Sequence, residues 1–139
     1  MRIVLDTNIL VAAIRSRSGA AFELLSSVGT GRFDIVVSVP LVLEYEDALL
    51  RHRQVAGLSV TDVRDLIDYL CRVGIHQRIF FLWRPMLRDP NDDMVAEVAV
   101  AASCTSIVTH NVADFFGVDK FGIAAVPPAK FLQRLRRLK

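Results

Sequence analysis

The chain has 139 residues, 53% of them hydrophobic, and a mean hydropathy of +0.38. This length is enough for one domain with a sizeable core, so we expect a single domain over residues 1–139. No apolar run approaches the roughly 18–20 residues of a membrane span, and Asp6 interrupts the first apolar stretch. We therefore expect no membrane segment and a cytoplasmic protein. The high apolar content predicts that a second copy covers part of the surface, in a homodimer or higher oligomer.

The net charge is only +2, but 14 of the 17 basic residues are arginines. Arginine binds phosphate through paired hydrogen bonds, so arginines on loops around an acidic centre would suit a nuclease. The alternative for each arginine is ordinary solvated surface. The candidates lie at positions 15, 17, 51, 53, 134, 136 and 137. Two cysteines, Cys71 and Cys104, lack zinc-type spacing and are interpreted as reduced, buried thiols.

Short apolar runs alternate with helical patterns along the chain. Strands are predicted at residues 2–5, 33–37, 79–83, 105–109 and 122–126. Helices are predicted at residues 9–14, 20–28, 38–50, from Ser59 or Thr61 to Gly74, at 92–103, and after Pro127. Residues 111–116 form a turn or a single helical turn. This alternation predicts an α/β protein, a three-layer α/β/α sandwich with a parallel sheet of about five strands.

Carboxylates follow four of these apolar runs. They are Asp6, Glu44, the pair Asp92 and Asp93, and Asp114. Because the C-terminal ends of parallel strands meet at one edge of a sheet, we expect these acids to converge where open α/β sheets bind ligands. Converging carboxylates repel one another and need a cation, and hard oxygen ligands select Mg²⁺ or Mn²⁺. The pattern therefore indicates metal-dependent phosphodiester chemistry.

Each acid also has a structural alternative. Asp6 could cap the following helix, a role compatible with metal binding. Glu44 flanks a predicted core stripe of Leu41, Tyr45, Ala48 and Leu49, and a buried pair with an arginine is its alternative. Glu46 and Asp47 of the same helix are predicted to face solvent.

The cluster of Asp89, Asp92 and Asp93 opens a helix that is apolar nearly all round. Acids in a first helical turn are also favoured by the helix dipole without any function. We expect one acid to cap the helix and its neighbour to face the cleft, and spacing alone does not decide between Asp92 and Asp93. Asp114 is either a site residue or a turn residue.

Taken in order, four motifs resemble the PIN domain. They are Leu5-Asp6-Thr7-Asn8, Leu43-Glu44-Tyr45, Asp89-Pro90-Asn91-Asp92-Asp93 and Val108-Thr109-His110-Asn111-Val112-Ala113-Asp114-Phe115. The chain is most similar to the PIN branch of toxin components from bacterial toxin–antitoxin systems, over essentially its whole length. The resemblance implies a Rossmann-like sheet and a Mg²⁺- or Mn²⁺-dependent endoribonuclease for single-stranded RNA. It also implies a cognate antitoxin protein as partner and, commonly, a dimer.

Carried over by position, the resemblance implies that Asp6, Glu44, Asp93 and Asp114 form the catalytic, metal-binding set. Asp93 is preferred over Asp92 because the family's acid directly precedes the apolar run. Polar residues that would orient these acids or a water are Thr7, Asn8, Asp92 and Asn111. Many relatives carry an acid where this chain has Asn111, which supplies no charge, so the resemblance does not imply a second tightly bound metal.

Two rival functions are weighed beside this one. A phosphohydrolase with Asp6 as nucleophile would need a second Asp two residues later, where this chain has Asn8. A catalytically inactive PIN-like domain that binds RNA or a partner is the main alternative, and the presence of all four acids argues against it. Loss of activity with a chelator would separate the nuclease from the binding domain.

Overall fold

The structure is a computed structural model and describes residues 1–79 and 90–138. Its strands are β1 (Arg2–Leu5), β2 (Asp34–Val37), β3 (Ile75–His76), β4 (Ser106–Val108) and β5 (Ala124–Val126). Its helices are α1 (Thr7–Arg15), α2 (Ala20–Ser26), α3 (Val39–His52), α4 (Val60–Val73), α5 (Pro90–Ala101) and α6 (Pro128–Arg137). Short 3₁₀ helices, η1 (Val112–Phe115) and η2 (Val118–Phe121), lie between β4 and β5.

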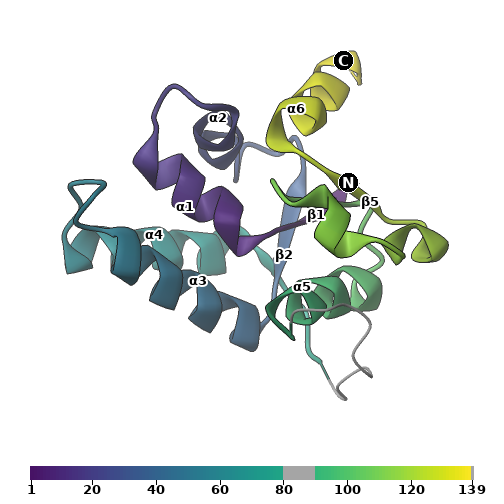
Figure 1. The fold of residues 1–139 in the computed structure, drawn as a ribbon, viewed down its shortest axis with the longest axis horizontal. Helices are drawn as coiled ribbons and strands as arrows, with labels where there is room; N and C mark the ends of the chain where they lie inside the picture. The colour runs from purple at the N-terminus through teal and green to yellow at the C-terminus, as the bar shows by residue number, and fades with distance from the viewer. Residues whose placement is uncertain (80–89, 139) are drawn as a thin grey trace.

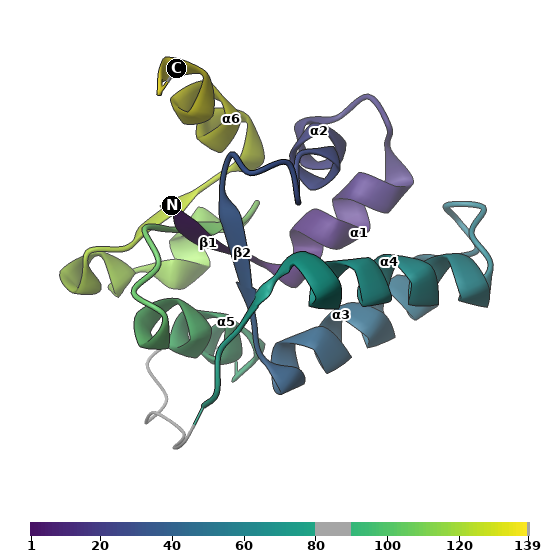
Figure 2. The same cartoon turned by 180° about the vertical axis from the view of Figure 1, so that it is seen from behind.

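The strands form one parallel sheet in the order β3-β2-β1-β4-β5. Helices α1 and α2 lie on one side of this sheet and α5 lies on the other (Figures 1 and 2). The predicted three-layer α/β/α sandwich with a five-stranded parallel sheet is confirmed. Every helix in the described residues is too short or too polar to cross a lipid bilayer.

Local sequence explains most of the element boundaries. The apolar run of β1 is buried, with Ile3, Val4 and Leu5 at most 1% exposed. Helix α3 begins at Ser38, whose hydroxyl accepts a hydrogen bond from the Leu41 N–H at 3.2 Å. Helix α4 begins at Ser59, which forms a reciprocal capping box with Asp62, so Ser59 rather than Thr61 opens the helix.

The predicted third strand at residues 79–83 is wrong at Ile79, which lies outside any strand; residues 80–83 lie outside the described residues. Strand β3 instead follows α4 directly. Gly74 ends α4 in an extended conformation, and a Cβ there would lie 2.7 Å from the Leu70 carbonyl oxygen. Ile75 and His76 then pair with β2 at the edge of the sheet, where backbone hydrogen bonds define a strand without a long apolar run.

Candidate functional site

The chain reverses direction across the sheet between β1 and β4. It runs from β1 to β2 and β3 on one side, then crosses back to β4 and β5 on the other. Open α/β sheets bind ligands at such a reversal, outside the C-terminal ends of the strands. The residues that directly follow β1 and β4 are Asp6 and Thr109, and they mark the candidate site.

Asp6 and Thr109 contact each other across this reversal. The Asp6 N–H donates to the Val108 carbonyl at 2.9 Å, which extends the pairing of β1 with β4. The Thr109 hydroxyl donates to Asp6 Oδ2 at 2.7 Å and accepts from the Asn111 N–H at 2.9 Å. Asp6 is 7% exposed and Thr109 is fully buried. The carboxylate is therefore held in one place at the edge of the sheet.

Asp6 also occupies the N-cap position of α1, which was its alternative role. Within the described residues, however, its side chain makes no capping hydrogen bond to that helix. Asn8, in the first turn of α1, accepts a hydrogen bond from the His110 N–H at 3.4 Å, which ties the start of α1 to the loop after β4. Thr7, the first residue of α1, is half-buried.

Helix α3 approaches the same edge through Tyr45. This side chain is 1% exposed, and its hydroxyl donates to the carbonyl of Leu5, the residue before Asp6. Burial, and next the charge of Asp6, raise the pKa of Tyr45 well above its usual value. The predicted core stripe of α3 is confirmed by its buried residues, and Glu44 lies half-buried beside it.

The prediction for Glu46 is wrong. Glu46 is half-buried, because α3 packs against α4. Desolvation, then the charges of Asp68 and Glu46, raise the pKa of Cys71 on α4, which places Glu46 near that interface. Asp47 does face solvent: its side chain is 67% exposed and lies 3.3 Å from Arg51 in an ion pair.

Helix α5 contacts both α3 and η1, so it lies between the elements that bear Glu44 and Asp114. Asp92 and Asp93 are both half-buried in its first turn, and their burial does not decide between them. Asp114 is exposed, and its N–H donates to the Asn111 carbonyl at 3.0 Å. Asp89 lies outside the described residues.

The structure places Asp6 directly after β1, Glu44 on α3, Asp93 on α5 and Asp114 on η1, and does not gather these four acids into a finished metal centre. Among residues 1–79 and 90–138, no three Asp, Glu, His or Cys side chains are placed to hold one ion. Carboxylate oxygens are the ligands that Mg²⁺ and Mn²⁺ prefer, so the donor chemistry fits such an ion.

Among the buried polar residues, Thr109 and Glu97 lie beside predicted site residues but were not themselves predicted. Thr109 belonged to a recognised motif, but its bond to Asp6 joins positions 103 residues apart. Glu97 is 7% exposed on α5, one helical turn after Asp93 and on the same face. A single acid within an otherwise apolar helical stretch is the sequence signal that would have indicated Glu97.

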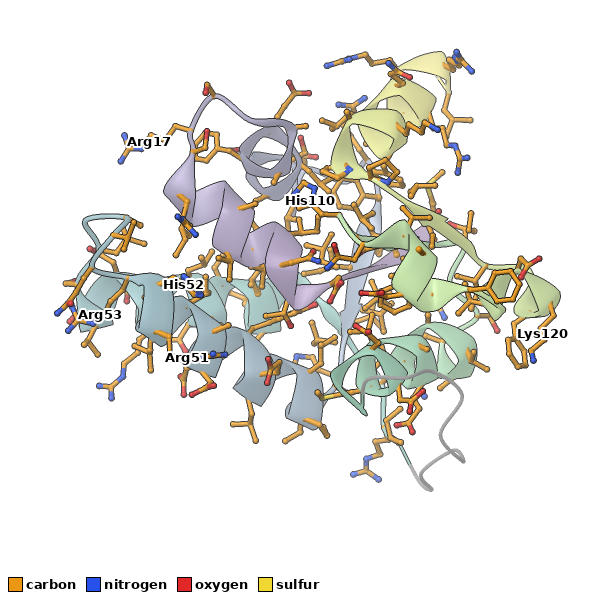
Figure 3. The ribbon with its side chains drawn as sticks, viewed as in Figure 1. Arg17, Arg51, His52, Arg53, His110 and Lys120 are labelled. Atoms are coloured by element: carbon orange, nitrogen blue, oxygen red, sulfur yellow. The ribbon has the colours of Figure 1, made fainter. Side chains whose placement is uncertain are left out.

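Arg17, Arg51 and Arg53 lie away from this edge. Figure 3 shows Arg51 and Arg53 at the C-terminal end of α3 and Arg17 beyond α1, apart from His110 at the end of β4. Arg53 donates to the Leu58 carbonyl at 3.4 Å. Seven residues of helix, roughly 10 Å, separate Glu44 from Arg51. These arginines are therefore poorly placed to contact a ligand at Asp6.

The fold and this edge define an α/β protein with a buried carboxylate, that of Asp6, at the switch point of its sheet. A family model described as the PIN domain matches residues 2–113, and the chain belongs to the PIN domain family. This confirms the resemblance, although the match ends one residue before Asp114. No match was found among proteins with curated descriptions.

Among solved structures, the chain is similar to VapBC2 from Rickettsia felis bound to a DNA fragment from their promoter. The TM-score is 0.59 at 16% sequence identity, and the alignment covers 90% of this chain and 98% of that chain. At this level of identity the similarity supports the fold.

Proposed function

We propose that this protein is a metal-dependent endoribonuclease that hydrolyses single-stranded RNA. Membership of the PIN domain family supports nuclease chemistry, because PIN domains are generally nucleases. The main structural support is the buried carboxylate of Asp6, which Thr109 holds at the switch point of the sheet. A carboxylate fixed at a ligand-binding edge is suited to a divalent cation.

In this proposal Asp6, Glu44, Asp93 and Asp114 hold Mg²⁺ or Mn²⁺. When bound, such an ion would lower the pKa of a water molecule and offset the negative charge that develops on the phosphate. Thr109 keeps the Asp6 carboxylate in one orientation, and Glu44 helps to orient the attacking water. Asn8 fixes the loop after β4, while Thr7, Asp92 and Asn111 supply further polar groups around the acids.

We also propose that the whole chain is one PIN-like domain and the toxin of a toxin–antitoxin pair, working in the cytoplasm as a homodimer or higher oligomer. The similar VapBC2 structure is a toxin–antitoxin complex, which supports an antitoxin partner. Exposed apolar side chains support a covering chain: Phe116 is 89% exposed, Val39 71% and Leu43 61%. The free thiols of Cys71 and Cys104 suit a reducing compartment.

The test is cleavage of a fluorescent single-stranded RNA by the wild type and by Asp6→Asn, each with Mn²⁺ and with EDTA. We expect the wild type to cleave with Mn²⁺, to stop in EDTA and to recover with excess Mn²⁺, and Asp6→Asn to be inactive throughout. Cleavage that persists in EDTA would contradict the metal dependence.

The second candidate is a catalytically inactive PIN-like domain that binds RNA or a protein partner. It is supported by Asn111, which supplies no charge at a position where the resemblance places an acid. RNA binding without cleavage under any metal condition would support this candidate over the nuclease.

A further inference from the structure

The C-terminal part of the chain is strongly basic. None of its described basic residues belongs to the acidic edge, by which we mean the edge of the sheet that carries Asp6 and Thr109. Residues 120–139 include six Lys and Arg and no Asp or Glu. Residues 1–119 include eleven Lys and Arg against fifteen Asp and Glu. The excess positive charge of the sequence therefore lies in its last twenty residues, and four of these six basic residues are on α6.

One face of α6 fixes the helix to the protein. Its buried residues are Pro128, Phe131, Leu132 and Leu135. The ring of Phe131 meets that of Phe33 edge-on, with centroids 5.5 Å apart. Arg136 forms an ion pair of 2.8 Å with Glu23 of α2, against which α6 packs. The opposite face of α6 is consequently presented on a fixed support.

That opposite face carries Lys130, Arg134 and Arg137, which are all exposed. Their spacing of four and then three residues places them in one row along the helix. Among the described residues none of the three forms an ion pair with a carboxylate. We call these three residues the α6 basic row.

Helix stability explains only part of this row. Arg134 and Arg137 lie in or near the last turn, where positive charge interacts favourably with the helix dipole. Lys130 lies in the first turn, where positive charge is unfavourable, and that turn contains no acid. The position of Lys130 therefore costs α6 some stability, and binding of an anionic ligand along the row would offset this cost.

The row begins near the acidic edge. The Thr109 N–H donates to the carbonyl of Val126 at 2.9 Å, so the end of β5 lies beside the residue that holds Asp6. Helix α6 starts two residues after Val126 and leads away from there to the C-terminus (Figure 1). From Lys130 to Arg137 the row extends over roughly 10 Å.

We propose that the α6 basic row binds the phosphate backbone of single-stranded RNA and leads the strand to the acidic edge. The choice of RNA rests on the proposed nuclease function. A row of positive side chains follows a backbone without reading its sequence, as in other proteins that bind single strands. The row, rather than Arg17, Arg51 and Arg53, is then the main electrostatic contact for the substrate.

The experiment measures binding of a labelled single-stranded RNA by fluorescence anisotropy in EDTA, where the RNA should stay intact. A Lys130→Gln/Arg134→Gln/Arg137→Gln variant is compared with a control, Arg17→Gln/Arg51→Gln/Arg53→Gln, that loses the same number of charges. For the row variant we expect the affinity for RNA to be lower by about ten-fold or more. The slope of log affinity against log salt concentration should be shallower by about 2, as expected when three contacts with a single strand are lost. The control should bind nearly as wild type. Melting curves establish that both variants are folded.

Unchanged RNA binding in the row variant, or equal losses in both variants, would overturn the inference. The inference would also be overturned if the row variant bound RNA as tightly as the wild type but no longer bound phosphatidylserine vesicles, because the row would then be a membrane-binding surface. Cleavage with Mn²⁺ is measured separately. RNA binding that depends on the α6 basic row, without cleavage, would contradict the nuclease function but not the inference about the row. Cleavage together with RNA binding that does not depend on the row would contradict the inference but not the nuclease function.

Discussion

The Thr109 hydroxyl lies 2.7 Å from Asp6 Oδ2 and so joins the ends of β1 and β4. A hydroxyl has one proton to donate, and Thr109 accepts a hydrogen bond from the Asn111 N–H at the same oxygen. Its single proton is therefore directed at the carboxylate. This makes Thr109 a positioning residue for Asp6, while Asp6 itself contacts the ligand in the proposed function.

Replacing Thr109 by Val keeps the shape of the side chain but removes the hydroxyl. We expect Thr109→Val to lower the RNA cleavage rate roughly 10- to 100-fold, because Asp6 loses its orienting partner. The free energy of unfolding should fall by about 1–3 kcal/mol, because the Asn111 N–H and Asp6 lose a buried partner. Thr109→Ser, which keeps the hydroxyl, should recover most of the rate. Cleavage assays and urea unfolding check both variants. A Ser variant that is as impaired as the Val variant would show that loss of the hydroxyl is not the cause.

Metal binding should appear in the melting temperature. An ion that binds only the folded protein stabilises it by about 2.7 kcal/mol at one hundred times its dissociation constant. We expect Mn²⁺ to raise the melting temperature of the wild type but not of Asp6→Asn. Asp34→Asn is the matched control, because Asp34 is exposed at the start of β2, and it should keep the full shift. An Asp6→Asn protein that also keeps the full shift would refute the assignment of Asp6.

Most of the fold could be predicted because short-range signals determine it. The apolar residues Ile3–Leu5 followed by Asp6 marked β1, and Ser38 with Pro40 marked the start of α3. Strand β3 could not be found in this way. It is two residues long at the edge of the sheet, and its pairing with Val36 and Val37 depends on where α4 ends. The apolar run at residues 79–83 predicted a strand that does not include Ile79, and residues 80–83 lie outside the described residues.

For the candidate site, the sequence could predict that Asp6 ends β1, but not the contacts that Asp6 makes. Parallel strands alone place Asp6 at the same edge as the loop after β4. The Thr109 hydrogen bond is a contact between distant residues, which no local pattern contains. Glu46 was wrongly predicted because helical periodicity describes one helix alone. It placed Glu46 outside the α3 core stripe, but α4 packs against that side of α3.

Stability should fall at alkaline pH in a way that depends on Cys104. Burial raises the pKa of this thiol to about 11, against a smaller opposing effect of Arg2, whereas an unfolded thiol titrates near 9.0. Between these values the unfolded state binds fewer protons than the folded state, so the free energy of unfolding decreases as pH rises. The slope from one group is at most about 1.4 kcal/mol per pH unit.

The check is urea unfolding of the wild type and of Cys104→Ala from pH 8 to pH 11. The variant should be less stable at pH 8, because a buried side chain is shortened, but its stability should fall less steeply above pH 9. Cys71 and Tyr45, whose pKa values are also raised, leave a remaining slope in the variant. Parallel curves for the two proteins would show that the Cys104 thiol does not contribute.

Glu44 and Asp47 give the sharpest test of the site, because they lie three residues apart on α3 in different surroundings. Glu44 is half-buried beside Tyr45, whereas the Asp47 side chain is 67% exposed and paired with Arg51. Glu44→Gln keeps shape and loses charge, so we expect Mn²⁺-dependent cleavage to be nearly abolished in a folded protein. Asp47→Asn should cost little, since exposed ion pairs contribute about 0–1 kcal/mol. Cleavage rates on one fluorescent RNA decide: equal losses would indicate a general effect of charge, and full activity in Glu44→Gln would remove it from the site.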